Sequence, residues 1–195
     1  DLVAHSRYGL WNTLRHSSFQ VVSVITTTGF TTTDYDIWPP LSRAILLILM
    51  FVGGSGGSTG GAIKVVRMNV LAKHSIRELK RAVYPRRVTV IRLNGKAVPE
   101  EVSSAVLAFV VLYVSVFLLS MLALSAMGLD FMSAVGAVAA TLGNIGPGFG
   151  LVGPACNYSA VPTIGKWLLS FCMLVGRLEV YTVLSLLVPG FWRKP

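Results

Sequence analysis

The sequence predicts an all-α membrane protein that contains two similar helix–loop–helix repeats. Of its 195 residues, 53% are hydrophobic and only 13% are charged, whereas an average soluble domain has about 25% charged residues. Several uncharged apolar stretches are long enough to be helices, and two of the shorter ones run into glycine-containing turns. Residues 43–53 also align without gaps with residues 166–176. These three observations together make a soluble domain a poor description of the chain.

The positive charge of the chain is concentrated in one segment. The formal net charge is +9, and ten of the seventeen basic residues fall between Lys64 and Lys96, opposed there only by Glu78. In a soluble protein such an excess would suggest nucleic-acid binding, but here the rest of the chain is nearly neutral and apolar. A short basic segment beside apolar helices is predicted to be cytoplasmic, which places residues 34–36 and 149–163 on the outer side.

The first half of the chain contains a short apolar helix, a turn and a broken helix. Residues 12–26 lead into the turn 27–32 and are too short to cross a bilayer, which takes about 20 residues. Residues 41–52 form a second apolar stretch, and residues 53–61 follow it with six glycines in nine positions. Helical spacing resumes over 62–71. We expect one helix that is interrupted by the glycine run.

The second half contains the clearest membrane span. Residues 102–129 carry no charge, which is typical of a spanning helix. Residues 131–141 lead into a second glycine turn at 144–148, and residues 167–188 form a further predicted span with an aromatic and basic end. Each short segment with its turn is equally consistent with a surface helix and an ordinary loop, but because the pattern occurs twice it favours re-entrant loops.

The internal alignment divides the chain into residues 1–98 and 99–195. Four of the eleven aligned positions are identical, and each copy is preceded by the same order of short helix, turn, linker and long helix. Because the sequence begins at Asp1 without a signal-peptide pattern, we expect it to be a piece of a longer chain whose missing part holds the first repeat's leading helix. Two repeats cannot enclose a pore, so a ring of four would need two more copies.

The two glycine turns have the residues that an ion filter requires. A potassium filter lines its path with backbone carbonyls, and glycine allows the backbone conformations that aim them inward. The turns resemble the potassium-channel pattern Thr-Val-Gly-Tyr-Gly, although each departs from it at one position. The predicted filter residues are Thr27, Thr28, Gly29 and Phe30 in the first turn and Asn144, Ile145, Gly146 and Pro147 in the second. The residues expected to contact K⁺ are Thr28, Gly29, Asn144 and Ile145.

The glycine run and one arginine are candidates for control of the ion path. Six glycines should unwind a helix, and unwound backbone at membrane depth must lie beside water or protein. We expect a gate loop below the filter; the alternative is a close-packing seam of small residues. Its residues are Gly53, Gly54, Ser55, Gly56, Gly57, Ser58, Thr59, Gly60 and Gly61. Arg177 aligns with Gly54, so it should lie at the depth of this loop, where it would repel cations; alternatively it pairs with Glu179 or helix-end carbonyls.

No enzyme chemistry is indicated. The G-x-G-x-x-G pattern at 148–153 is followed by Pro154 and lacks a surrounding strand–helix unit. The three histidines are scattered without metal-ligand spacing. We therefore expect no catalytic residues.

Four segments, residues 25–34, 53–61 with Lys64, 140–148 and 176–180, together resemble the C-terminal half of the TrkH-like subunits in the Trk/Ktr/HKT superfamily of potassium transporters. The resemblance implies a potassium-channel-like pore of four helix–pore loop–helix repeats, of which residues 1–98 are the third and 99–195 the fourth. It implies K⁺ as the transported ion, the gate role of residues 53–61, and Arg177 as a pore-lining residue. One departure is Gly143, where the family pattern leads us to expect an asparagine before Asn144.

The resemblance also implies partners and a location. Subunits of this kind are homodimers in the bacterial inner membrane. This sequence would then continue an N-terminal half in the same polypeptide. The subunits associate with a TrkA-like cytosolic ring that binds nucleotide, so nucleotide is expected only on that partner. The basic segment is either a solvated loop that only sets topology or the docking site for this ring, alongside anionic lipid headgroups. The docking candidates are Glu78, Lys80, Arg81, Arg86 and Arg87. An alternating-access cation transporter and a non-conducting membrane scaffold remain as alternative functions.

Overall fold

The computed structural model describes residues 2, 9–84, 90–93 and 95–178. The described chain is helical. Its helices are α2 (Leu10–Ile25), α3 (Pro40–Met50), α4 (Val65–Val83), α5 (Glu100–Ala126), α6 (Phe131–Leu142) and α7 (Thr163–Arg177). Two short 3₁₀ turns cover Gly150–Val152 and Tyr158–Ala160. Two pairs of two-residue strands complete it: β1 (Val52–Gly53) with β2 (Ile63–Lys64) in parallel, and β3 (Arg92–Leu93) with β4 (Lys96–Ala97) antiparallel.

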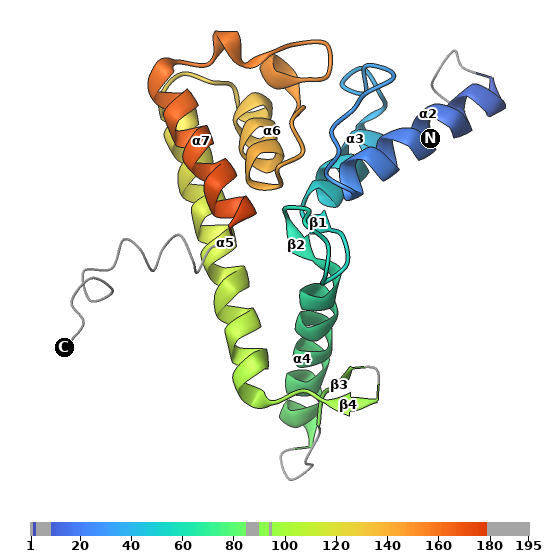
Figure 1. The fold of residues 1–195 in the computed structure, drawn as a ribbon, viewed down its shortest axis with the longest axis vertical. Coiled ribbons are helices and arrows are strands. Elements are labelled where there is room, and N and C mark those ends of the chain that lie inside the picture. The colour runs from blue at the N-terminus through green and yellow to red at the C-terminus, as the bar shows by residue number, and fades with distance from the viewer. Residues whose placement is uncertain (1, 3–8, 85–89, 94, 179–195) are drawn as a thin grey trace.

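The helices form one body with a long extension. Figure 1 shows α2, α3, α6 and α7 gathered at the upper end, while α4 and α5 run from this body to the lower end. The β3–β4 hairpin lies at that lower end, between α4 and α5 in the chain. The two long helices are tied together there, because the Ser103 hydroxyl lies 2.9 Å from Nδ1 of His74 and Arg77 forms an ion pair with Glu100 at 3.3 Å.

Local sequence explains where the helices begin. Pro40 occupies the first turn of α3, where a missing N–H costs nothing. Glu100 and Glu101 lie in the first turn of α5, where negative charge is favourable to the helix dipole. Asp130 caps α6 and accepts a hydrogen bond from the Ser133 backbone N–H at 3.1 Å.

One described helix is long and apolar enough to cross a membrane. This helix, α5, has 27 residues, and at about 1.5 Å per residue it is about 40 Å long, more than the hydrocarbon core requires. It matches the predicted span 102–129 with both ends shifted by two or three residues toward the N-terminus. Only 22% of its most apolar window is buried, so most of this surface is open to lipid or to other protein.

Helix α6 is the centre of the body. Every residue from Ser133 to Leu142 is buried, and α5 and α7 pack against it. The helix is rich in small residues, which lets the backbone of its neighbours come close. A Cβ on Gly136 would meet Phe149, so the loop after α6 folds directly back onto the helix.

The structure differs from the sequence-based expectations in three places. The chain becomes helical again at Val65 rather than at residue 62, and α4 then continues to Val83. Much of the basic segment is therefore helix and hairpin instead of loop, because no glycine or proline interrupts residues 65–83 and Pro85 follows only afterwards. Helix α7 begins at Thr163, four residues before the predicted span 167–188, of which residues 179–188 lie outside the described residues.

Candidate functional site

The two predicted filter turns have left-handed backbone at the same two positions. Each begins immediately after a short helix, α2 or α6. Thr27 and Asn144, each two residues after the helix ends, both have a φ of 54°. Gly29 and Gly146, two residues further on, have φ values of 79° and 115°. Left-handed backbone is unfavourable for a β-branched residue such as Thr27, so the surroundings must hold this loop in place.

The two turns also share their hydrogen bonds. In each, the residue before the glycine donates its backbone N–H to the carbonyl five residues earlier, and the residue before that donates to the carbonyl three residues earlier. The four bonds are Thr28 to Ser23 (2.9 Å), Ile145 to Ala140 (2.8 Å), Thr27 to Val24 (3.1 Å) and Asn144 to Thr141 (3.0 Å). The register is the one in which Gly29 aligns with Gly146.

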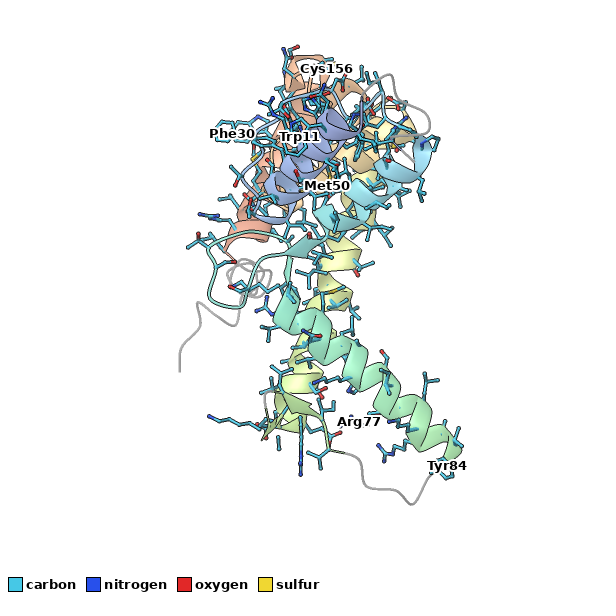
Figure 2. The ribbon with its side chains drawn as sticks, turned by 90° about the vertical axis from the view of Figure 1, so that its right-hand side faces the viewer. Trp11, Phe30, Met50, Arg77, Tyr84 and Cys156 are labelled. Carbon is cyan, nitrogen blue, oxygen red and sulfur yellow. The ribbon has the colours of Figure 1, made fainter. Side chains whose placement is uncertain are left out.

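The two turns meet. A Cβ on Gly29 would overlap the Ile145 carbonyl and lie 3.4 Å from Cδ of Pro147, so only glycine fits at position 29. This contact brings together two of the four predicted K⁺ contacts. Among the described residues, the carbonyls of Thr28, Gly29, Asn144 and Ile145 accept no hydrogen bond. Their oxygens are thus available to an ion. Phe30 is 72% exposed and points outward from the body in Figure 2.

The glycine run 53–61 forms a loop directly beside both turns. The parallel pairing of β1 with β2 closes its neck, and the loop between them contains no helix. A Cβ on Gly61 would overlap the Gly143 carbonyl, and a Cβ on Gly60 would lie 3.1 Å from Oγ1 of Thr27. The residues predicted as a gate therefore contact the end of α6 and the first filter turn.

The position of Gly143 leaves little room for a side chain. A Cβ there would lie 2.9 Å from the Ala139 carbonyl oxygen and 3.0 Å from that of Met50. The next residue, Asn144, donates from Nδ2 to the Met173 carbonyl of α7 at 3.1 Å. In this chain the turn is thus supported by one asparagine and a close backbone contact.

Arg177 reaches the glycine loop. Its guanidinium donates a hydrogen bond to the Thr59 carbonyl, so the arginine and the loop meet as the internal alignment predicts. The two border a cavity of about 250 Å³ that is also lined by Lys64 and Arg67. The Arg67 guanidinium stacks over the Phe109 ring at 4.1 Å. Three cationic side chains therefore surround the space next to the loop.

Two tyrosines that the sequence analysis missed hold the second turn. The Tyr35 hydroxyl lies 3.0 Å from the carbonyl oxygens of both Pro147 and Gly148, and the Tyr158 hydroxyl donates to the Gly146 carbonyl at 2.7 Å. Burial raises the pKa of Tyr158 to about 12. Burial also raises the pKa of Tyr35, and electrostatic interactions with Tyr158 and two nearby aspartates raise that pKa further. Both hydroxyls therefore stay protonated and able to donate.

The docking candidates lie on the last turns of α4. Lys80 and Arg81 are exposed there, near Tyr84, which Figure 2 shows at the lower end of the helix. Glu78 pairs with Arg77 at 3.0 Å, so part of its charge is already used within the chain. Arg86 and Arg87 lie outside the described residues. In the same described part of the chain, no group of three or more His, Cys, Asp or Glu side chains is arranged to hold a metal ion.

Comparison with known proteins identifies relatives along nearly the whole chain. The profile of the TrkH family, described as a cation transport protein, matches residues 6–192. The Trk system potassium uptake protein TrkH of Salmonella typhimurium is 48% identical over 182 residues, which are 93% of this chain and 37% of that protein. The protein of the same name from Vibrio parahaemolyticus is 47% identical over 190 residues, 97% of this chain and 39% of its own length.

A solved structure has the same fold. The crystal structure of the potassium transporter TrkH from Vibrio parahaemolyticus matches with a TM-score of 0.90 and 46% sequence identity, over 98% of this chain and 41% of that one. The chain thus spans about two fifths of the length of the relatives it matches.

Proposed function

Because the chain belongs to the TrkH family of cation transport proteins, we propose that it forms the third and fourth pore-loop repeats of a potassium uptake protein of the bacterial inner membrane. The two relatives named above carry the name potassium uptake protein. The observation that carries the proposal is the pair of turns with left-handed backbone at equivalent positions, which meet at Gly29 and Ile145.

In this proposal, K⁺ is the transported ion and passes between backbone carbonyls. The carbonyls of Thr28, Gly29, Asn144 and Ile145, which accept no hydrogen bond within the described part of the chain, replace part of its hydration shell. Two repeats supply two sides of the filter, and the N-terminal half of the same polypeptide supplies the other two. The apolar surface of α5 that stays open in this chain is consistent with contact to that half, to lipid or to a second subunit.

Residues 53–61 act as the gate. The loop contacts Gly143 and Thr27, which belong to or adjoin the two turns, and the hydrogen bond from Arg177 holds it across the path. Arg177 also lines the adjacent cavity, where its positive charge opposes the entry of a cation while the loop is in this position. Displacement of the loop opens the path.

The lower end of α4 recruits the regulator. A TrkA-like cytosolic ring that binds nucleotide docks on Glu78, Lys80, Arg81, Arg86 and Arg87, with anionic lipid headgroups beside it. Exposed Leu79, Val83 and Tyr84 adjoin these charges, so the surface has both the apolar and the charged groups of a protein interface. The whole protein is a homodimer. Substitution of the five docking residues by alanine should abolish ring binding in a pull-down and leave membrane insertion unchanged.

The central test is rubidium uptake into proteoliposomes by a full-length protein that carries this sequence. Gly146→Ser is the test variant: the position has a φ of 115° but open space around it, so the change alters the backbone without a clash. Gly128→Ser is the matched control, since Gly128 has a φ of 96° and open space in the α5–α6 turn.

Wild-type protein should take up rubidium in competition with potassium but not sodium, and only Gly146→Ser should reduce this preference. Equal preference in the two variants would contradict the filter assignment. Absence of uptake by the wild type, with and without a nucleotide-bound ring, would instead favour a non-conducting scaffold.

A further inference from the structure

The carbonyl that follows the key glycine is held by a side-chain hydroxyl in both turns. In the first turn, Ser23 of α2 donates to the Phe30 carbonyl at 2.7 Å. The equivalent carbonyl of the second turn belongs to Pro147, and it lies 3.0 Å from the Tyr35 hydroxyl. The same contact is thus made by different donors in the two turns.

The sequence explains the change of donor. The residue that aligns with Ser23 in the second copy is Ala140, which has no hydroxyl. Tyr35 supplies the missing donor from the linker between α2 and α3, 112 residues away in the chain. Its side chain is 0% exposed, and the rings of Trp38 and Phe149 pack edge-on against it. The hydroxyl is therefore fixed in position rather than adjustable.

A second tyrosine holds the glycine itself. Tyr158 lies beyond the 3₁₀ turn that follows the second filter turn, and its hydroxyl donates to the Gly146 carbonyl at 2.7 Å. The carbonyls of Gly146, Pro147 and Gly148 consequently all face tyrosine hydroxyls. In this turn, only the carbonyls before Gly146 are left for an ion.

We propose that Tyr35 and Tyr158 are positioning residues that set ion selectivity, because they turn three carbonyls of the second turn away from the ion path and fix the spacing of the others. This inference rests on the proposed potassium filter and names residues that determine its preference. Tyr35 also links the two repeats, since a residue of the first linker determines the backbone of the second turn.

The test compares phenylalanine variants, which keep the aromatic rings and remove only the hydroxyls. Tyr35→Phe and Tyr158→Phe are made in the full-length protein. Tyr113→Phe is the matched control, because Tyr113 is 1% exposed and its hydroxyl has no hydrogen-bond partner among the described residues. The readout is the inhibition of rubidium uptake by potassium relative to sodium, together with gel filtration of each variant. A purely structural role would lower the amount of folded protein without changing this ratio.

Each test variant should reduce the preference for potassium over sodium about fivefold, the equivalent of one neutral hydrogen bond of about 1 kcal/mol, while Tyr113→Phe leaves it unchanged. If Tyr35→Phe does not fold, Tyr158→Phe decides, since Tyr158 is only partly buried. Wild-type preference in folded Tyr35→Phe and Tyr158→Phe would overturn the inference and leave the potassium filter standing. A wild-type protein without any preference would overturn the filter itself.

Discussion

Replacement of Arg177 by alanine tests the gate most directly. The side chain makes a hydrogen bond to the Thr59 carbonyl of the loop. A hydrogen bond from a charged donor contributes about 1.5–3 kcal/mol, and solvent screening at this exposed residue reduces it to about 1 kcal/mol. A loss of that size shifts the equilibrium between the closed and displaced loop about fivefold toward the displaced form, at 1.4 kcal/mol per tenfold.

Rubidium uptake by full-length protein in proteoliposomes, without the regulatory ring, should therefore rise about fivefold. The removed positive charge acts in the same direction, so this value is a lower bound. Arg177→Lys separates the two contributions, because it keeps the charge and changes the geometry of the donor; its uptake should lie between those of the wild type and Arg177→Ala.

Lys166→Ala is the matched control. Lys166 also lies on α7 and donates to a backbone carbonyl, that of Ser159, at 3.1 Å. Its removal deletes the same kind of charge and the same kind of bond from the other end of the helix. Uptake by Arg177→Ala that is equal to or lower than that of Lys166→Ala would refute the role of the arginine in holding the loop closed.

Three further predictions concern the gate loop, stability and orientation. Gly61→Ala should alter uptake more than Gly57→Ala in the same assay, since a Cβ at Gly61 would overlap a carbonyl and one at Gly57 would meet nothing within 4 Å; equal effects would contradict the packing of the loop. Asp130→Ala should lower the unfolding free energy by about 1 kcal/mol through loss of the α6 cap. The hydrogen bonds from Ser133 lower the pKa of Asp130 below 3.8. The stabilisation by this cap is therefore present above about pH 4 and is lost as the pH falls through the folded-state pKa. Thermal unfolding of wild type and variant in detergent at pH 3 to 6 would measure this loss. Cys156 is exposed and should react with a membrane-impermeant maleimide added outside intact cells. Labelling only after the cells are permeabilised would place Cys156 on the cytoplasmic side and reverse the predicted orientation.

The parts of the fold that depend on local sequence could be predicted from it. An uncharged run the length of a bilayer has few alternatives to a spanning helix, so the sequence located α5 within three residues at each end. The conformations of Gly29 and Gly146 follow the same logic, because both positions require a left-handed backbone that glycine adopts without strain. The contact between Arg177 and the glycine loop could be predicted because the internal alignment places both at the same depth.

Features that depend on contacts across the chain could not be predicted. Thr27 has a left-handed conformation that its own side chain disfavours, so only its surroundings hold it there. The bond between Tyr35 and the Pro147 carbonyl joins residues separated by 112 positions, and nothing near Tyr35 in the sequence marks it. The aligned pair Ser23 and Ala140 was the one available signal: once the turns are superposed, the second copy lacks a donor that the first copy has.

The close contacts of the glycine loop imply that the proposed gate and the proposed filter do not move independently. Gly61 fits against Gly143 only because it has no side chain, and a Cβ on Gly60 would be in tight contact with Thr27, at 3.1 Å from its Oγ1. Thr27 is the strained residue of the first turn, and Gly143 precedes the residue with the same conformation in the second. When the loop leaves these positions, both turns lose packing on the side that the loop now covers. Opening should therefore loosen the proposed filter, and the hydroxyl contacts of Ser23, Tyr35 and Tyr158 should then become more important for holding its carbonyls in place.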